Sequence, residues 1–195
     1  MPFAVPMAMP QFWLFEGLAL IFFAFVIRAM IRRPKESGGH RETRSRSGII
    51  LQSVGIGLAG VGDVRPTLPW LTPTAICAYA AIVLLMGGAI ALFASSSTAL
   101  GRNWSIEART LYDHDLIRTG PYARVRHPIY LAMLLFLLGL AVALGHYVQL
   151  LIAIPLFLVG TRIRTEAEDR LLEQSFGDAF REYRSATPAL FPKIV

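Results

Sequence analysis

Charged residues are scarce in this chain of 195 residues: Asp, Glu, Lys and Arg make up 16% of it, whereas 54% is hydrophobic. Soluble domains carry about 25% charged residues, so this is not the composition of a water-solvated globule. Long apolar runs replace the missing charge, and the mean hydropathy is +0.51. The combination predicts an integral membrane protein.

Negative charge is scarcer than positive charge: the chain has 13 acidic and 19 basic residues, and its formal net charge is +6. In a soluble protein this excess would suggest a nucleic-acid partner. Here the arginines lie just outside apolar runs, so anionic headgroups and membrane topology account for them. No nucleic-acid partner is therefore expected.

Cysteine is almost absent, because Cys77 is the single one and it lies in an apolar stretch. It cannot form an internal disulfide and offers no metal-ligand spacing, so no metal site is predicted. We interpret Cys77 as a small buried hydrophobic residue. A cleavable signal peptide is not expected, because the first apolar run is too long and its positive charges follow it.

Five apolar stretches are candidates for helices that cross a bilayer, which takes about 20 residues. They cover residues 10–30, 48–64, 72–93, 129–144 and 147–160. Only Gly145 and His146 separate the last two, so these should form an antiparallel helical hairpin, short enough to require tilting or local thinning of the bilayer. The predicted fold class is an all-α integral membrane protein with about five transmembrane helices.

The tail beyond residue 160 is polar but periodic. Apolar side chains recur there at helical spacing, with charged residues between them, at Leu171, Leu172, Phe176, Phe180 and Tyr183. This pattern predicts a C-terminal amphipathic helix that lies on the membrane or packs against the preceding loop.

Several glycines lie inside the apolar stretches. Gly55, Gly57 and Gly60 match the G-x-G-x-x-G pattern of nucleotide-binding loops, but no strand precedes them and the surrounding pattern is an apolar helix. We interpret them, like Gly87 and Gly88, as positions where small residues let two helices approach closely.

Positive charge marks one side of the predicted bundle. Segments 32–47 and 95–127 and the tail after residue 160 are rich in arginine, whereas the two opposite connections hold only Arg65. The positive-inside rule then places the N-terminus outside and the C-terminus and active site in the cytoplasm, in an inner or plasma membrane. We interpret segment 32–47 as a topology determinant without chemistry, and Glu16 as a functional candidate because intramembrane acids are costly.

Two polar segments on the cytoplasmic side carry the candidate chemistry. In the first, His127 precedes Pro128, which suits the first position of a helix, so a helix N-terminus is expected at the membrane surface. Its free N–H groups suit a carboxylate or phosphate, with Tyr122, His127 and Tyr130 gathered around it. The alternative is that these side chains are interfacial anchors, which are common at membrane boundaries.

In the second segment, Arg164 and Glu168 lie four residues apart and share one face of a helix that continues out of the fifth apolar stretch. The hairpin would bring this pair close to His127. From the spacing alone, a functional pair and an ordinary surface ion pair both stay open.

Together the two segments carry a family resemblance. Residues 120–130 read G-P-Y-A-R-V-R-H-P-I-Y, and after the helical hairpin residues 168–183 read E-D-R-L-L-E-Q-S-F-G-D-A-F-R-E-Y. This combination resembles the isoprenylcysteine carboxyl methyltransferase family and the wider group that includes phospholipid N-methyltransferases. The resemblance covers about residues 100–192. It divides the chain into a three-helix transmembrane region, residues 1–99, and a methyltransferase-like cofactor-binding region, residues 100–195.

The resemblance implies a membrane-embedded methyltransferase that holds S-adenosylmethionine between the loop before the hairpin and the helix after it. It implies two catalytic residues: Arg164 orients the substrate, and Glu168 contacts the cofactor. The other implied cofactor-binding residues are Glu107, His114, Asp115, Leu116, Ile117, Tyr122, His127, Pro128 and Tyr130. The sequence departs from the family at Asp169, where the family has Glu, and at Phe180, where it has Tyr.

Proton chemistry separates the possible methyl acceptors. A carboxylate is already ionised at neutral pH, so Arg164 need only orient it, whereas an amine or thiol must lose a proton to a base such as His127 or Glu168. The preferred acceptor is therefore the carboxylate of an isoprenylcysteine-like molecule that enters from the bilayer. A lipid amine or a small thiol is the alternative.

Two further classes compete with a methyltransferase. Sterol-type membrane reductases resemble the family in their C-terminal half, but they have more spans and use a nicotinamide cofactor. A transporter or membrane scaffold would show charges inside the spans or inverted repeats, and the apolar stretches show only Glu16 well inside one. The sequence does not fix an oligomeric state.

Overall fold

The computed structural model describes residues 4–32, 40–41, 45–101, 109–110 and 115–191. Its long elements are five helices, α1 (Met9–Ile31), α2 (Ser45–Gly60), α3 (Pro73–Leu100), α4 (Pro128–Leu144) and α5 (Leu150–Phe176). The short ones are the 3-10 helix η2 (Gly120–Ala123), α6 (Asp178–Ala186) and the strands β1 (His40–Arg41) and β2 (Arg109–Thr110). Among the described residues the fold is all-α, as predicted, apart from this one pair of two-residue strands.

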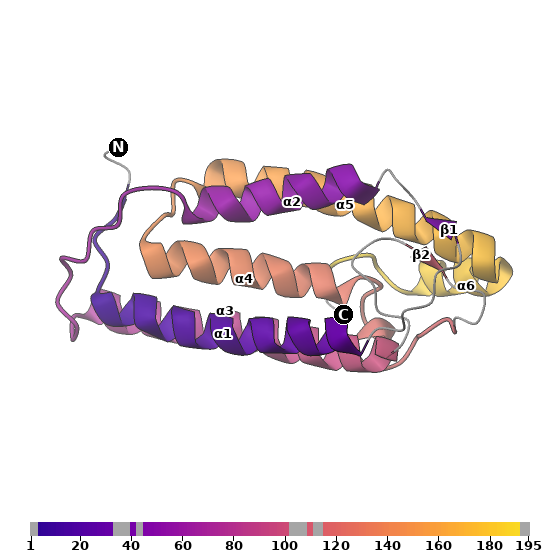
Figure 1. Cartoon of the computed structure of the whole chain (residues 1–195), viewed down its shortest axis with the longest axis horizontal. Helices are drawn as coiled ribbons and strands as arrows, with labels where there is room; N and C mark the ends of the chain where they lie inside the picture. The colour runs from indigo at the N-terminus through magenta and orange to yellow at the C-terminus, as the bar shows by residue number, and fades with distance from the viewer. Residues whose placement is uncertain (1–3, 33–39, 42–44, 102–108, 111–114, 192–195) are drawn as a thin grey trace.

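The long helices run side by side along the long axis of the molecule (Figure 1). α2 and α5 lie together on one side, α1 and α3 lie on the other, and α4 lies between the two pairs. One apolar cluster joins α1, α3 and α4 and includes Phe22 and Phe136. A second joins α2, α4 and α5 and includes Leu137 and Phe157. α4 is therefore the central helix that holds the two pairs together.

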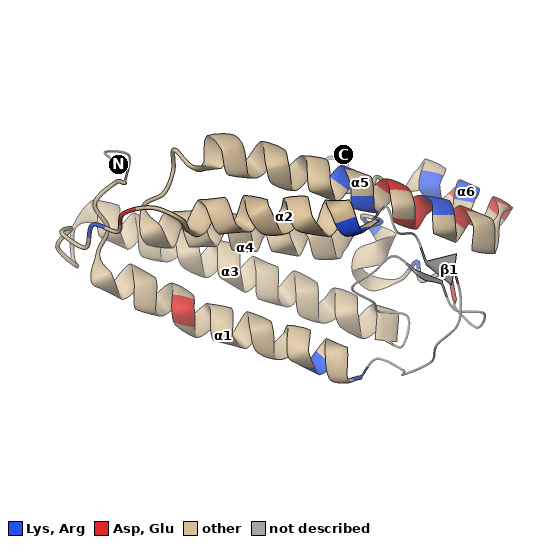
Figure 2. Ribbon diagram, turned by 45° about the horizontal axis from the view of Figure 1, so that its top comes forward, with Lys and Arg blue, Asp and Glu red and all other residues tan. Residues whose placement is uncertain are grey.

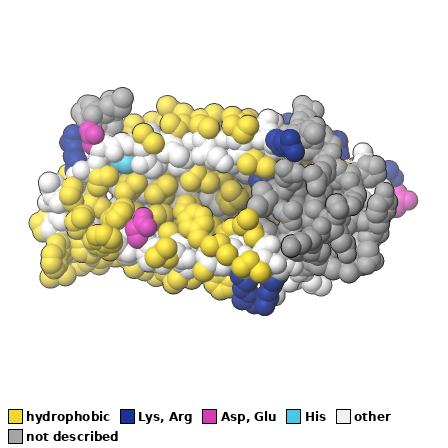
Figure 3. Space-filling view, in the orientation of Figure 1, with side chains coloured by type: hydrophobic (Ala, Val, Ile, Leu, Met, Phe, Trp, Pro, Cys, Tyr) yellow, Lys and Arg dark blue, Asp and Glu magenta, His cyan; other side chains and the backbone are white. Residues whose placement is uncertain are grey.

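Two helices, α1 and α3, are long and apolar enough to cross a membrane, with 23 and 28 residues and hydropathies of 2.2 and 2.4. α4 is apolar but has 17 residues, and α5 turns polar and charged after Gly160. Apolar side chains cover much of the described outer face (Figure 3), among them Leu20, Leu84 and Leu151, which are 70% to 76% exposed. An apolar exterior around an apolar core is typical of a membrane protein. The total of five spans stays a prediction.

Cys77, which the sequence suggested was buried, is exposed on α3. That interpretation was wrong because α3 is apolar on every side, so its pattern does not distinguish the face that meets other helices from the face that meets lipid.

The hairpin and the tail differ in detail from the prediction. α4 ends at Gly145, whose φ of +70° is favourable for glycine, and α5 begins at Leu150. α5 then continues without a break to Phe176. Gly177, with a φ of +52°, ends it and starts α6. The predicted amphipathic helix is thus two pieces, because Gly177 takes a backbone conformation that other residues rarely adopt.

Small residues bring α2 and α5 close together. A Cβ added at Gly48 would lie 2.7 Å from the carbonyl oxygen of Gly160, and one at Gly55 would lie 2.9 Å from that of Ala153. The close-packing prediction is confirmed at Gly55. It is wrong at Gly57, where no described atom outside the helix's own backbone lies within 4 Å of an added Cβ.

The other predicted glycine contacts are mixed. An added Cβ would lie 3.4 Å from Leu140 at Gly60 and 3.3 Å from Leu135 at Gly88, so both glycines pack against α4. At Gly87 nothing among the described atoms comes within 4 Å. Neighbouring glycines on a helix point in different directions, so only some of them can serve a given interface.

Segment 32–47, interpreted from the sequence as a topology determinant, contains β1 and the start of α2 at Ser45. β1 pairs antiparallel with β2, so that His40 lies opposite Thr110 and Arg41 opposite Arg109. The described part of this segment is therefore tied to the loop that precedes the candidate site.

Candidate active site

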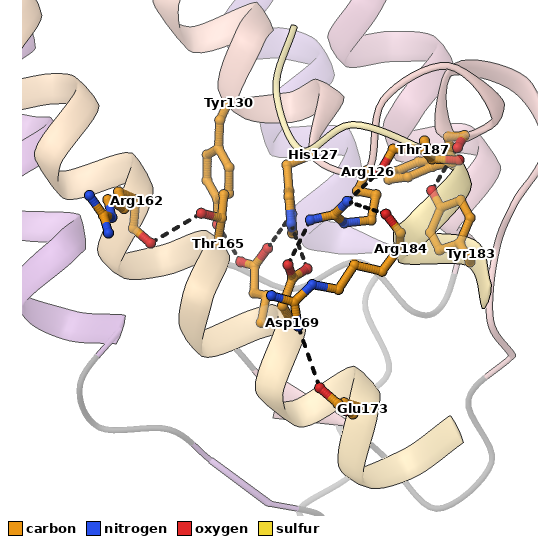
Figure 4. A network of polar contacts seen from close by, with 12 residues as sticks. Arg126, His127, Tyr130, Arg162, Thr165, Asp169, Glu173, Tyr183, Arg184 and Thr187 are labelled. Carbon is orange, nitrogen blue, oxygen red and sulfur yellow. Dashed lines mark hydrogen bonds and ion pairs between the residues drawn. The ribbon is translucent and has the colours of Figure 1, made fainter. Parts of the chain in front are cut away.

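Charged side chains gather at one end of the described bundle, where α4 begins and α5 leaves the apolar core (Figure 2). A network of polar contacts occupies this end (Figure 4). It centres on two adjacent carboxylates of α5, Glu168 and Asp169, and on the residues at the start of α4. The helical hairpin brings these two parts of the chain together, as the sequence predicted.

His127 caps the N-terminus of α4, and Pro128 is the first residue of that helix. Proline is favourable there because its missing N–H would have no partner inside the helix. The backbone N–H groups of Arg126 and His127 donate to the carbonyl oxygens of Pro188 and Ala189, at 2.9 and 3.0 Å. The C-terminal segment thus lies against the start of α4 and helps to bury His127.

The His127 ring bridges both carboxylates. Its Nδ1 lies 3.1 Å from Glu168 Oε2, its Nε2 lies 3.0 Å from Asp169 Oδ1, and its side chain is 4% exposed. Burial by itself would lower the pKa of His127, but the hydrogen bonds and charges of the two carboxylates raise it overall. With a carboxylate beside each nitrogen, this environment favours the imidazolium form, which can donate from both nitrogens.

Glu168 is where the network converges. Besides His127, it accepts a short hydrogen bond from the Tyr130 hydroxyl, and its Oε1 lies 3.9 Å from Nη2 of Arg164. Burial by itself would raise the pKa of Glu168, but His127, Arg164 and Tyr130 lower it overall. Its side chain is 26% exposed, so part of Glu168 is accessible from outside the network.

Arg164 is buried, although it carries a charge. Its guanidinium lies over the ring of Tyr130, with 4.8 Å between the Cζ atom and the ring centroid. Its Nη1 donates to Oε1 of Gln52 on α2 at 3.0 Å. Gln52 was not predicted from the sequence. The signal that could have found it was an amide side chain inside an otherwise apolar stretch.

Asp169 and Arg126 form a second ion pair, with 2.9 Å between Asp169 Oδ2 and Arg126 Nη2. Burial would raise the pKa of Asp169, but His127 and Arg126 lower it overall. Arg126 also donates to the carbonyl oxygens of Thr187 and Arg184 (Figure 4). The sequence analysis did not assign Arg126 a role, because nothing in its spacing marks it among the neighbouring arginines.

Tyr122 lies in η2 and is buried, and its carbonyl oxygen accepts a hydrogen bond of 2.6 Å from the Tyr183 hydroxyl of α6. Burial raises the pKa of Tyr122 well above its usual value and that of Tyr183 to about 12. Both hydroxyls are therefore neutral at physiological pH, and the hydrogen bond links α6 to η2.

The structure brings together Tyr130, Arg164 and Glu168 around His127, with Pro128 at the helix start. This proximity does not test any of the catalytic or cofactor-binding roles, which all stay predictions. Asp115 is exposed, and Leu116 and Ile117 are half-buried. Glu107 and His114 lie outside the described residues.

With this geometry in view, comparisons with known proteins are informative. The family model described as phospholipid methyltransferase matches residues 76–179, which include His127, Tyr130, Arg164 and Glu168. The chain belongs to the phospholipid methyltransferase family. The two motifs indicated a resemblance to isoprenylcysteine carboxyl methyltransferases. This match and the similarity to a Schizosaccharomyces pombe enzyme confirm it.

Protein-S-isoprenylcysteine O-methyltransferase of Schizosaccharomyces pombe is 32% identical over 106 residues, which are 53% of this chain and 44% of the relative. The cobalt-zinc-cadmium resistance protein of Cupriavidus metallidurans is 30% identical over 78% of this chain and 66% of its own length. The nickel-cobalt-cadmium resistance protein of Alcaligenes xylosoxydans xylosoxydans is 31% identical over 41% of this chain and 37% of its own length. The chain therefore spans less than two thirds of each of these relatives.

Proposed function

We propose that this protein is an S-adenosylmethionine-dependent methyltransferase that acts on a lipophilic acceptor, preferably the carboxylate of an isoprenylcysteine-like molecule. The observation that carries the proposal is the partly exposed Glu168 side chain, whose carboxylate is held in place by His127 and Tyr130 with Arg164 beside it. All four residues lie within the stretch that matches the family.

The residues present fit the proposed cofactor, which would supply a methyl group on a sulfonium when bound. A carboxylate has about four lone-pair positions, and Glu168 uses some of them for its hydrogen bonds with His127 and Tyr130. Those that remain can accept the ammonium group of a methionine moiety. The N-terminal end of α4 beside it would favour the carboxylate of the same moiety, because the helix dipole is positive there.

The state of His127 favours an acceptor that is already ionised. Both of its ring nitrogens bond to carboxylates, and its pKa is raised, so it is not a free base. Glu168 has a lowered pKa and is a weak base. An amine must lose a proton before or during attack, whereas a carboxylate needs only to be oriented, and a guanidinium such as that of Arg164 can do so. A lipid amine or a small thiol is therefore the less favoured acceptor.

The apolar part of the acceptor would enter sideways from the bilayer, and the cofactor from the cytoplasm. The long apolar helices α1 and α3 and the charged end where Glu168 lies support this arrangement. In-line displacement then requires mainly that the protein align acceptor and donor and exclude water.

The test is calorimetric titration of the purified protein in detergent with S-adenosylhomocysteine, followed by transfer of labelled methyl. We expect micromolar binding or better, and label on an isoprenylcysteine carboxylate in preference to a lipid amine or a thiol. Absence of binding in a detergent that preserves the fold would contradict the cofactor assignment. Label that appears only on amine or thiol acceptors would overturn the carboxylate preference.

A further inference from the structure

Gln52 is a polar side chain inside the bundle with hydrogen-bond partners at both ends of its amide. It lies in the middle of α2 and is 1% exposed. Its Oε1 accepts from Arg164 Nη1 at 3.0 Å, and its Nε2 donates to the hydroxyl of Thr161 at 2.8 Å. Because each end of the amide has a different partner on α5, the side chain is fixed in a single orientation.

The backbone around Gln52 brings α2 close enough to hold the side chain of Arg164. A Cβ at Gly48 would lie 2.5 Å from Cγ of Arg164, so the stem of this arginine lies directly against α2. A Cβ at Gly160 would lie 2.8 Å from the backbone nitrogen of Gln52. The stem of Arg164 is thus confined by a glycine and its charged head by an amide.

The guanidinium is held from two directions. Gln52 binds Nη1 from the α2 side, and the ring of Tyr130 lies under the charged group from the α4 side. Nη2 then lies towards Glu168, 3.9 Å from Oε1. An arginine side chain has many rotamers, and losing this freedom before the acceptor arrives improves alignment during the reaction.

We infer that Gln52 is a positioning residue for methyl transfer, which holds the guanidinium of Arg164 where it can orient the acceptor. This inference rests on the proposed function, in which Arg164 meets the acceptor. It also extends the functional part of the chain to α2, which lies outside the stretch from residue 76 to 179 that matches the family.

The competing role for Gln52 is purely structural, as a hydrogen-bonded link between two helices. The two roles differ in what they change. A structural link lowers stability and affects every function of the folded protein through that loss. A positioning residue lowers turnover in the folded protein, and its effect disappears once Arg164 is gone.

The experiment compares Gln52→Leu, which removes both hydrogen bonds, with Gly55→Ala, which disturbs the same helix contact nearby on α2 without reaching Arg164. If Gln52→Leu does not fold, Gln52→Asn takes its place, because asparagine keeps the amide on a side chain that is shorter by one methylene group. Turnover, KM for the acceptor, S-adenosylhomocysteine affinity and thermal stability are measured for each variant, and again with Arg164→Ala added.

We expect Gln52→Leu to lower kcat by about 10-fold to 100-fold, as misalignment of a reacting group does, with cofactor affinity changed less than about threefold. Gly55→Ala should lower thermal stability without lowering kcat of the folded protein. In the Arg164→Ala background, Gln52→Leu should cause no further loss of kcat.

Equal kcat values for Gln52→Leu and Gly55→Ala, or losses that multiply in the double variant, would overturn the inference and leave Gln52 a structural link. An inactive wild-type protein would instead refute the proposed function, and the inference with it. The two failures are thus distinguished by whether the wild-type protein turns over.

Discussion

The two sides of the bundle are held together by different physical means. On one side, α1 and α3 pack against α4 through aromatic rings, with 5.2 Å between the ring centroids of Phe22 and Phe93 and 5.1 Å between those of Phe22 and Phe136. On the other side, glycines let the backbones of α2 and α5 approach, and the buried pair Gln52 and Arg164 lies between them.

This difference suggests that one side of the bundle mainly provides stability and that the other holds the proposed catalytic groups. Side chains that fill a volume tolerate rearrangement as long as the volume is kept, so the aromatic side serves as a scaffold. A buried guanidinium must keep its partners, because an unpaired buried charge is very costly. The proposed catalytic residue Arg164 therefore lies on the side where glycines bring two helices close and a buried polar pair joins them. Variants on each side can test the comparison.

The largest effect on stability is expected for Phe22→Ala, on the aromatic side. Phe22 is 5% exposed and contacts Phe93 and Phe136. The cavity should lower the free energy of unfolding by about 3 kcal/mol, near the low end for such changes, because lipid or detergent can relax around α1. Thermal denaturation in detergent measures this loss. The folded fraction should keep its kcat, and a large loss of kcat there would contradict the separation of roles.

On the polar side, Glu168→Ala should weaken S-adenosylhomocysteine binding by about 100-fold, since a hydrogen bond to a charged group contributes about 1.5–3 kcal/mol. Calorimetry measures the change. Glu166→Gln is the matched control, because Glu166 pairs with the exposed Arg162 at 2.8 Å on the same helix. Unchanged affinity in Glu168→Ala would remove Glu168 from the cofactor site.

Arg164→Ala should lower kcat by at least about tenfold while cofactor affinity changes little, since the proposed role of Arg164 is to orient the acceptor. Arg164→Lys should restore little of this loss, because an ammonium cannot reproduce a planar two-point contact. Arg162→Ala is the control, since that side chain is 81% exposed. Normal turnover of Arg164→Ala with the preferred acceptor would place the acceptor elsewhere.

The smallest effect is expected from pH. The pKa of His127 is raised above its ordinary 6.5, so the stability that its pairing contributes is fully present below about pH 6.5 and is lost as pH rises through the folded-state value. The pKa values of Glu168 and Asp169 are lowered from 4.5 and 3.8, so their contribution is present above about pH 4.5 and is lost as pH falls through the folded-state values.

Stability should therefore be highest between about pH 4.5 and 6.5 and should decline on the alkaline side. His127→Gln should flatten that alkaline decline, which thermal denaturation at a series of pH values would measure. A decline of the same size in the variant would show that another group titrates there.

The sequence predicts where the two halves of the site lie along the chain, but it identifies only some of the residues that form the site. Pro128 after His127 marks the start of α4, and the spacing of Arg164 and Glu168 places them on one helix face, so local rules find these residues. Arg126 and Gln52 were missed because their roles depend on partners far away in the chain, 43 residues away at Asp169 and 112 at Arg164. Only packing decides such pairs.

The glycines and Cys77 show the same limit within a single helix. In an apolar stretch every face has the same hydrophobicity, so the pattern predicts a helix but not its rotation. The sequence therefore could not show that Gly55 packs against α5 while Gly57 does not, or that Cys77 is exposed.

Hydropathy, charge asymmetry and two short motifs were thus enough, without a structure, to predict a helical membrane protein and the family to which it belongs. These features are local, and they follow from the solvation of each segment and from the spacing of residues on one helix. The tertiary structure alone decided which helix faces meet, that His127 bridges two carboxylates, and that α2 holds Arg164. Such contacts depend on how the helices are rotated and how closely they approach, which local sequence does not encode.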